Sequence, residues 1–208
     1  MPRPSQNTDR RLIEAARRLL PETGCSGLKM RQVAAKANVN LGMFHYHFKT
    51  KDEFLRRVLQ EFYEEFFKDF ELEATHHATP LENLRAALFT FAIFARDNRK
   101  LVFVLLRDAM NGEKAVYDFL RANLHRHIAI LLQLIGECQK QGELPKLAPP
   151  NILVTLIASM NMPSIISEGV RRSPASRGKK NVTPVLEAHV LSNAALSARL
   201  MFLLGDPK

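Results

Sequence analysis

The chain has 208 residues, of which 46% are hydrophobic and 25% charged, the composition of an ordinary soluble globular protein. Its net charge of +9 is unevenly spread, because residues 1–60 hold 12 Lys and Arg against 5 Asp and Glu, whereas residues 61–208 hold 18 against 16. Two cysteines cannot form a disulfide framework, and the longest apolar run, Leu101 to Leu106, is far shorter than the ~20 residues that cross a bilayer. We therefore expect a cytoplasmic protein with no membrane partner.

Helical periodicity dominates the sequence, and no alternating strand pattern bounded by turns occurs, so the predicted fold class is all-α. The first predicted helix covers residues 9–20, with Thr8 as its N-cap, and Pro21 and Gly24 are expected to stop it. Since most of the positive excess lies in this first third of the chain, a partner with a phosphate backbone is the favoured interpretation.

Two short helices and a tight turn follow, at about residues 30–36 and 40–47. Asn38 adopts a left-handed turn conformation more readily than most residues, and Asn40 can cap the second helix. This is the pattern of a helix-turn-helix, in which small residues let the two helices cross closely. A long helix then starts after Thr50, with Phe44 and Phe48 before it expected in the core.

The remaining predicted helices cover residues 81–98, 99–110, 114–141, 152–170 and 185–204, and a kink is expected at Pro163. Residues 75–80 are interpreted as a loop at a domain boundary, and residues 171–184 as a mobile basic loop. The predicted organisation is a helix-turn-helix domain over residues 1–52 and a helical ligand-binding and dimerisation domain over residues 53–208.

The predicted DNA contacts fall into two groups, because phosphate contacts fix the register of a protein on DNA whereas contacts with base edges give specificity. The expected phosphate donors are Lys29, Tyr46, His47, Thr50 and Lys51. The expected base readers are Asn40, Leu41, Met43 and His45. Gly42 has no side chain near the helix start, so the backbone there can come close to a base.

Residues 8–55 resemble the DNA-binding domain of the TetR (tetracycline-repressor) family of transcriptional regulators. The matching residues are Ile13-Glu14-Ala15-Ala16, Gly24, Val33-Ala34, Ala37, Val39, Gly42 and the run from Tyr46 to Leu55. The resemblance implies about nine helices, a homodimer, a palindromic operator and a ligand whose binding moves the DNA-reading heads. It also implies phosphate contacts for Tyr46, His47 and Lys51.

Three positions depart from the family pattern. Lys29 stands where a Thr or Ser usually caps the second helix, Asn38 replaces the usual turn glycine, and His45 replaces the usual Tyr. Loss of a cap costs about 1 kcal/mol, although Lys29 can offer its charge to a phosphate instead. The change at His45 puts the standard contact there in doubt.

The second domain is expected to surround an apolar cavity for a hydrophobic or aromatic small molecule. The predicted lining residues are Leu84, Leu88, Phe91, Phe94, Phe103, Arg107, Phe119, His125 and Met160. The helices near 152–170 and 185–204 are expected to pair with their copies in a dimer. No catalytic motif and no metal-ligand spacing occurs, so we expect neither an enzyme nor a cofactor nor a metal site.

These observations together predict a ligand-responsive DNA-binding transcriptional regulator, in the first place a repressor. Three alternatives stay open. One is an activator of the same family. Another is a small-molecule-binding protein or enzyme on this fold that has lost operator binding. The third is a nucleoid protein that binds DNA without regard to sequence. The intact Tyr46-His47-Phe48 run, followed by Lys51, favours operator binding.

Overall fold

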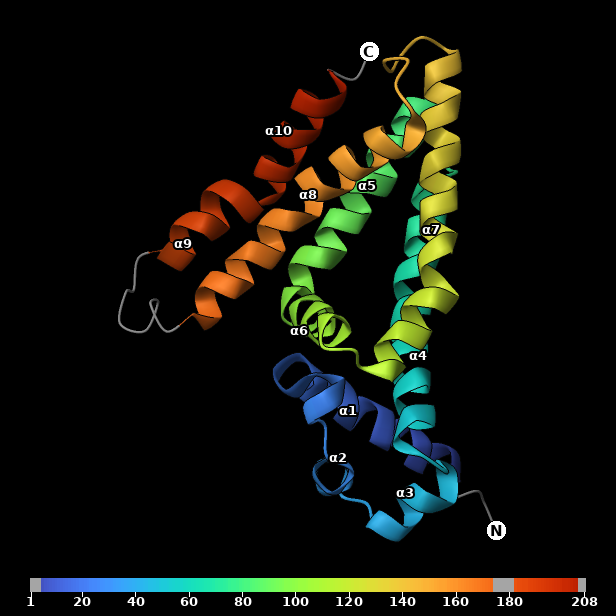
Figure 1. Ribbon diagram of the computed structural model, residues 1–208, viewed down its shortest axis with the longest axis vertical. Coiled ribbons are helices and arrows are strands. Elements are labelled where there is room, and N and C mark those ends of the chain that lie inside the picture. The colour runs from blue at the N-terminus through green and yellow to red at the C-terminus, as the bar shows by residue number, and fades with distance from the viewer. Residues whose placement is uncertain (1–4, 174–181, 206–208) are drawn as a thin grey trace. The chain divides into compact units, whose positions relative to one another are not determined.

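A computed structural model describes residues 5–173 and 182–205, and in these residues every regular element is helical (Figure 1). The elements are α1 (Ser5–Gly27), α2 (Met30–Ala37), α3 (Leu41–His47), α4 (Lys51–Glu73), α5 (Pro80–Asp97), α6 (Arg99–Met110), α7 (Lys114–Lys140), α8 (Pro149–Arg172), α9 (Val182–Leu186), the π-helical segment η2 (Glu187–Leu191) and α10 (Asn193–Leu204). The predicted all-α fold is confirmed.

The chain forms two compact units, and neither is one continuous stretch of sequence. The first comprises residues 1–64 and 100–123, and the second comprises residues 65–99 and 124–208. The first unit therefore contains α6 and the start of α7 besides the helix-turn-helix. The sequence predicts a single boundary between residues 52 and 53. That prediction does not include α6 in the first unit.

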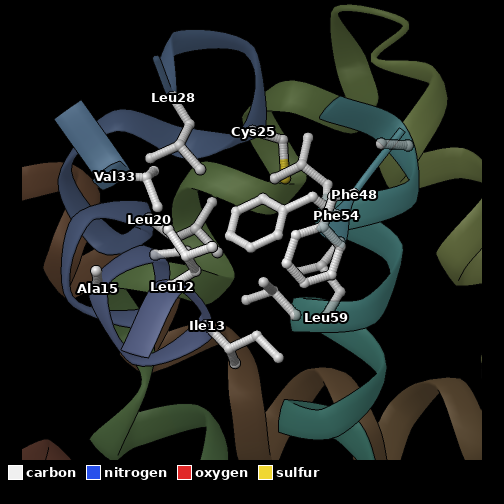
Figure 2. Packing of buried hydrophobic residues seen from close by; sticks show 14 of the residues in the cluster. Leu12, Ile13, Ala15, Leu20, Cys25, Leu28, Val33, Phe48, Phe54 and Leu59 are labelled. Carbon is white, nitrogen blue, oxygen red and sulfur yellow. The ribbon is translucent and has the colours of Figure 1, made fainter. Parts of the chain in front are cut away.

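The core of the first unit explains why it needs helices beyond the first three. Leu12 and Leu20 of α1 and Phe44 of α3 are fully buried against Phe54 of α4 and Val104 of α6. Figure 2 shows the side chains of α1 converging on those that follow α3 and begin α4. The first three helices alone bury too little apolar surface to be stable, so α4 and α6 complete the core.

The end of α1 differs from the prediction. The helix continues through Pro21 and breaks only at Gly24, where φ is 71° and ψ is −179°. This backbone conformation is essentially restricted to glycine. The expectation that Pro21 ends the helix is therefore wrong, whereas the expectation for Gly24 is confirmed.

The C-terminal region also differs from the prediction of one helix over 185–204. It is divided into α9, η2 and α10, and Ser192 marks the last break because its hydroxyl accepts a hydrogen bond of 3.2 Å from the Ala195 amide. Part of the predicted loop at 171–184 is helical, since α8 ends at Arg172 and α9 begins at Val182. Ser173 is the C-cap of α8, and residues 174–181 of that loop lie outside the described residues.

In the second unit, α5 packs against α8 and α10, and Figure 1 shows α5 running along α8. Two arginines of α5 bind the last helix: Arg85 donates to the carbonyl of Leu204 at 2.9 Å, and Arg96 donates to the Asn193 side chain at 2.6 Å. Among the described helices, α8 is long and apolar enough to cross a membrane, but 44% of its apolar stretch is buried inside the protein. We treat α8 as a core helix of this unit.

Candidate nucleic-acid interface

The turn between α2 and α3 has the geometry that the sequence predicts. Asn38 lies in the left-handed region, with φ 52° and ψ 50°, and the amide of Val39 donates to the carbonyl of Ala34 at 2.9 Å. Val33, Ala34 and Ala37 are buried on the inner face of α2. A left-handed residue followed by such a backward hydrogen bond closes the end of a helix and sends the chain sharply into α3.

A charged side chain from α1 fixes this turn, and sequence reasoning missed it. The guanidinium of Arg11 donates to the carbonyls of Ala37 at 2.6 Å and Asn38 at 2.9 Å. These are carbonyls at the end of α2, where helices lack partners of their own. Arg11 therefore holds the α2–α3 turn against α1.

The predicted base-reading residues form the start of α3. The Asn40 side chain accepts a hydrogen bond of 2.8 Å from the amide of Gly42, so its role as the α3 cap is confirmed. Asn40, Gly42 and His45 are exposed, whereas Leu41 and Met43 are half-buried and Leu41 packs on the core of the unit. The exposed side of α3 thus presents Asn40 and His45, beside a backbone left open at Gly42.

Four of the five predicted phosphate donors are accessible around this helix. Tyr46 is 78% exposed, Lys29 is exposed, and Lys51 is half-buried. Lys29 makes no side-chain cap, as its departure from the family pattern predicts. The exposed Thr50 accepts from the Glu53 amide at 3.1 Å and so caps α4, while the Lys51 ammonium donates to the carbonyl of Ser26 at 3.2 Å.

The prediction for His47 needs correction. Its side chain is only 6% exposed, and Nδ1 lies 2.5 Å from a carboxylate oxygen of Asp9 in α1. A carboxylate held this close keeps the imidazole turned inward, away from a DNA surface. We assign His47 to the contact between α3 and α1 in place of a phosphate contact.

Exposed basic residues on α2 are further candidates for phosphate contact that sequence reasoning missed. Arg31 and Lys36 are exposed on this helix, on either side of the buried positions Val33, Ala34 and Ala37, and Lys49 is exposed after α3. The helical spacing of the apolar residues could have identified them, because it fixes which side of α2 faces outward.

The nine predicted ligand-lining residues do not all belong to one unit. Phe103, Arg107 and Phe119 lie in the first unit, whereas the other six lie in the second. In the second unit Leu84, Leu88 and Met160 are fully buried, Phe91 and Phe94 are half-buried, and His125 is exposed.

The buried histidine of α7 is His127. Its ring packs at 5.2 Å from that of Phe91 and about 6 Å from those of Phe66 and Phe70. Burial, with the nearby charge of Arg126, lowers the pKa of His127 to about 4, so the ring is neutral at neutral pH. We call the group formed by Phe66, Phe70, Phe91, Phe94 and His127 the aromatic cluster.

A helix-turn-helix with an exposed second helix and basic neighbours is the architecture of a DNA-binding regulator. Residues 12–58 match the family model described as "Bacterial regulatory proteins, tetR family". A relative from Bacillus subtilis, named "Probable HTH-type transcriptional regulator YttP", is 27% identical over 159 residues, which are 76% of this chain and 77% of YttP. Residues 12–58 therefore form a helix-turn-helix of the TetR type, and the chain is similar to TetR-family transcriptional regulators.

Two solved structures share the fold of the whole chain. FadR from Bacillus subtilis, in complex with stearoyl-CoA, has a TM-score of 0.70 at 17% identity and covers 95% of this chain and 99% of its own. AibR, in complex with isovaleryl coenzyme A and operator DNA, has a TM-score of 0.72 at 15% identity, covering 96% and 100%. At these identities the likeness concerns the fold, which extends the resemblance beyond the helix-turn-helix.

Proposed function

We propose that the protein is a cytoplasmic repressor that binds a palindromic operator as a homodimer and is released by a hydrophobic small molecule. The observation that carries the proposal is the exposed side of α3 with Asn40 and His45, flanked by Lys29, Tyr46 and Lys51. In a two-fold dimer, two such helices meet half-sites one helical turn or a multiple apart, at about 34–36 Å per turn.

The dimer interface is proposed on α8 and α10, which expose apolar side chains. Val154, Met162 and Ile166 of α8 are exposed, and so are Met201 and Phe202 of α10, with Phe202 at 89%. On α10 the exposed residues Ala194, Ser197 and Ala198 are small, which allows a second helix to approach closely. Exposed apolar faces of this kind are typical of surfaces that another chain covers.

Phe202→Glu is expected to convert the dimer into a monomer with little change in the fold of each chain. A nearly fully exposed phenyl ring contributes little to the monomer, whereas a carboxylate buried without a partner at an interface costs several kcal/mol. Sedimentation equilibrium measures the mass, and Leu72→Glu on the exposed side of α4 is the matched control. An unchanged dimer in Phe202→Glu would place the interface elsewhere.

The effector is proposed to bind in the second unit beside the aromatic cluster. The rings of this cluster offer the apolar environment that a hydrophobic ligand needs. Because FadR and AibR were solved with acyl-CoA molecules, acyl-CoA thioesters are the first ligand class to test. A shift of operator affinity by the effector needs only about 1–3 kcal/mol of coupling.

Lys51→Ala is expected to reduce the salt dependence of operator binding without changing the preferred sequence. Each phosphate that a cation neutralises contributes about 0.9 to the slope of log affinity against log salt concentration. Lys51 lies at the start of α4, where helix amides also favour an anion. Titrations at several salt concentrations measure the slope, and a relaxed sequence preference would contradict the phosphate role.

Selection of binding sites from random DNA tests the whole proposal. We expect a palindromic sequence bound at least ~10³-fold more tightly than random DNA, and released when acyl-CoA molecules or extracted metabolites are added. Equal affinity for selected and random DNA would indicate a nucleoid protein instead. Binding that appears only in the presence of the effector would indicate an activator.

A further inference from the structure

A buried carboxylate on α6 binds the segment that ends α1. Asp108 is fully buried, and its Oδ2 accepts hydrogen bonds from the amides of Cys25 at 2.6 Å and Ser26 at 3.3 Å. The hydroxyl of Ser26 donates to Oδ1 at 2.9 Å. All of these residues lie in the first unit. The Asp108 carboxylate therefore accepts hydrogen bonds from two amides and one hydroxyl of the residues that follow the break in α1.

The neighbours of the Asp108 carboxylate stabilise its charged form. The guanidinium of Arg107 lies 2.9 Å from Oδ1 and also donates to the carbonyl of Thr23 at 3.1 Å. Burial by itself raises the pKa of Asp108, but the hydrogen bonds from Arg107, Ser26 and Cys25 outweigh it and hold the pKa below its ordinary value. At neutral pH Asp108 is an ionised acceptor with all its hydrogen bonds made.

The segment that Asp108 binds also contacts Lys51, one of the proposed phosphate donors. The carbonyl of Ser26 accepts the hydrogen bond from Lys51 Nζ at 3.2 Å. An ammonium group has three donors, so two remain for other partners. Ser26 thus binds Asp108 through its amide and hydroxyl, and Lys51 through its carbonyl.

We propose that Asp108 is a positioning residue for operator binding, which acts by fixing Ser26 so that its carbonyl places the Lys51 ammonium for a phosphate. The proposal rests on the proposed phosphate role of Lys51. It extends the DNA-binding machinery to α6, far along the chain from the helix-turn-helix. A long, flexible lysine side chain loses entropy when it is ordered, and a fixed carbonyl removes part of that cost before DNA arrives.

The test measures operator affinity and its salt dependence for Asp108→Asn, for Lys51→Ala and for the double variant. In the otherwise unchanged protein, Asp108→Asn is expected to weaken binding about tenfold and to lower the salt slope by up to about 0.9. In the Lys51→Ala background it is expected to change affinity less than about twofold, because the group that it positions is gone. A purely structural role would leave the slope unchanged and weaken binding equally in both backgrounds.

Two further variants separate this result from loss of folding. Ser26→Ala removes only the hydroxyl bond to Asp108, on an exposed residue, and is expected to reproduce a smaller part of the effect. Asp118→Asn on α7 removes another carboxylate of the same unit, paired with Lys114 at 2.5 Å, and is expected to leave affinity and slope unchanged. Folded fractions are measured by circular dichroism.

The outcomes distinguish the two proposals. If Lys51→Ala leaves operator affinity and slope unchanged, the phosphate role of Lys51 is wrong, and the inference about Asp108 falls with it. In the other case Lys51→Ala weakens binding, and Asp108→Asn weakens it by the same factor whether or not Lys51 is present. The phosphate role of Lys51 then stands, and the positioning role of Asp108 is overturned.

Discussion

Gly24→Ala is expected to lower the free energy of unfolding by about 3 kcal/mol or more. Two costs add at this position. The backbone φ of 71° with ψ near 180° is strained for any residue with a Cβ. A Cβ built there would also lie 2.4 Å from Oδ2 of Asp108 and from Arg107 Nη2. Relieving that clash would break the hydrogen bonds of Asp108 to the end of α1.

The matched control is Gly27→Ala, three residues further on. A Cβ at Gly27 would meet only the Cβ of Thr23, at an ordinary 3.5 Å, and Gly27 has no positive φ. This variant is expected to be as stable as the parent or slightly more stable, because alanine favours helix over glycine. Denaturant unfolding compares the three proteins, and equal stability of Gly24→Ala and Gly27→Ala would refute the account of the α1 break.

The free energy of unfolding is expected to fall by roughly 3 kcal/mol as the pH drops from about 7 to about 4, through His127 alone. Burial, with the charges of Arg126 and His125, lowers its pKa from 6.5 to about 4. Between these values the unfolded chain binds a proton on His127 and the folded chain does not. Protons therefore favour the unfolded chain in this window, and stability is fully present above about pH 6.5.

His127→Phe is expected to remove this pH dependence while keeping an aromatic ring among Phe66, Phe70 and Phe91. His76→Gln is the control, because His76 is an exposed histidine of the same unit and its loss should leave the dependence intact. Chemical unfolding at pH 7, 5.5 and 4.5 gives the three profiles. Parallel profiles for His127→Phe and the parent would show that another group titrates.

The features that the sequence predicted well are the local ones. The left-handed turn at Asn38, the cap at Asn40 and the start of a long helix after Thr50 each depend on a residue type and on neighbours within a few positions. Such hydrogen bonds form within one turn of the chain, so composition and spacing are enough to place them. Phe44 and Phe48 were also expected in the core, and both are buried.

The features that the sequence did not reveal depend on partners distant in the chain. His47 was expected to face a phosphate because nothing in its own segment shows that Asp9 of α1 lies 2.5 Å away. Arg11 binds carbonyls 26 and 27 residues on, and Asp108 binds amides 82 and 83 residues away. Periodicity states which side of a helix is buried, but not which helix covers it. For the same reason the predicted ligand lining mixed residues of both units.

The path of the chain between the two units has a consequence for engineering. The polypeptide passes from one unit to the other three times, after residues 64, 99 and 123. A fragment cut at the predicted boundary near residue 52 would lack Leu55, Val58 and Val104, which belong to the core around α1. Hybrid regulators that join this reading head to a foreign sensor therefore cannot be spliced at one point. They need a transplant that carries residues 100–123 together with the first 64.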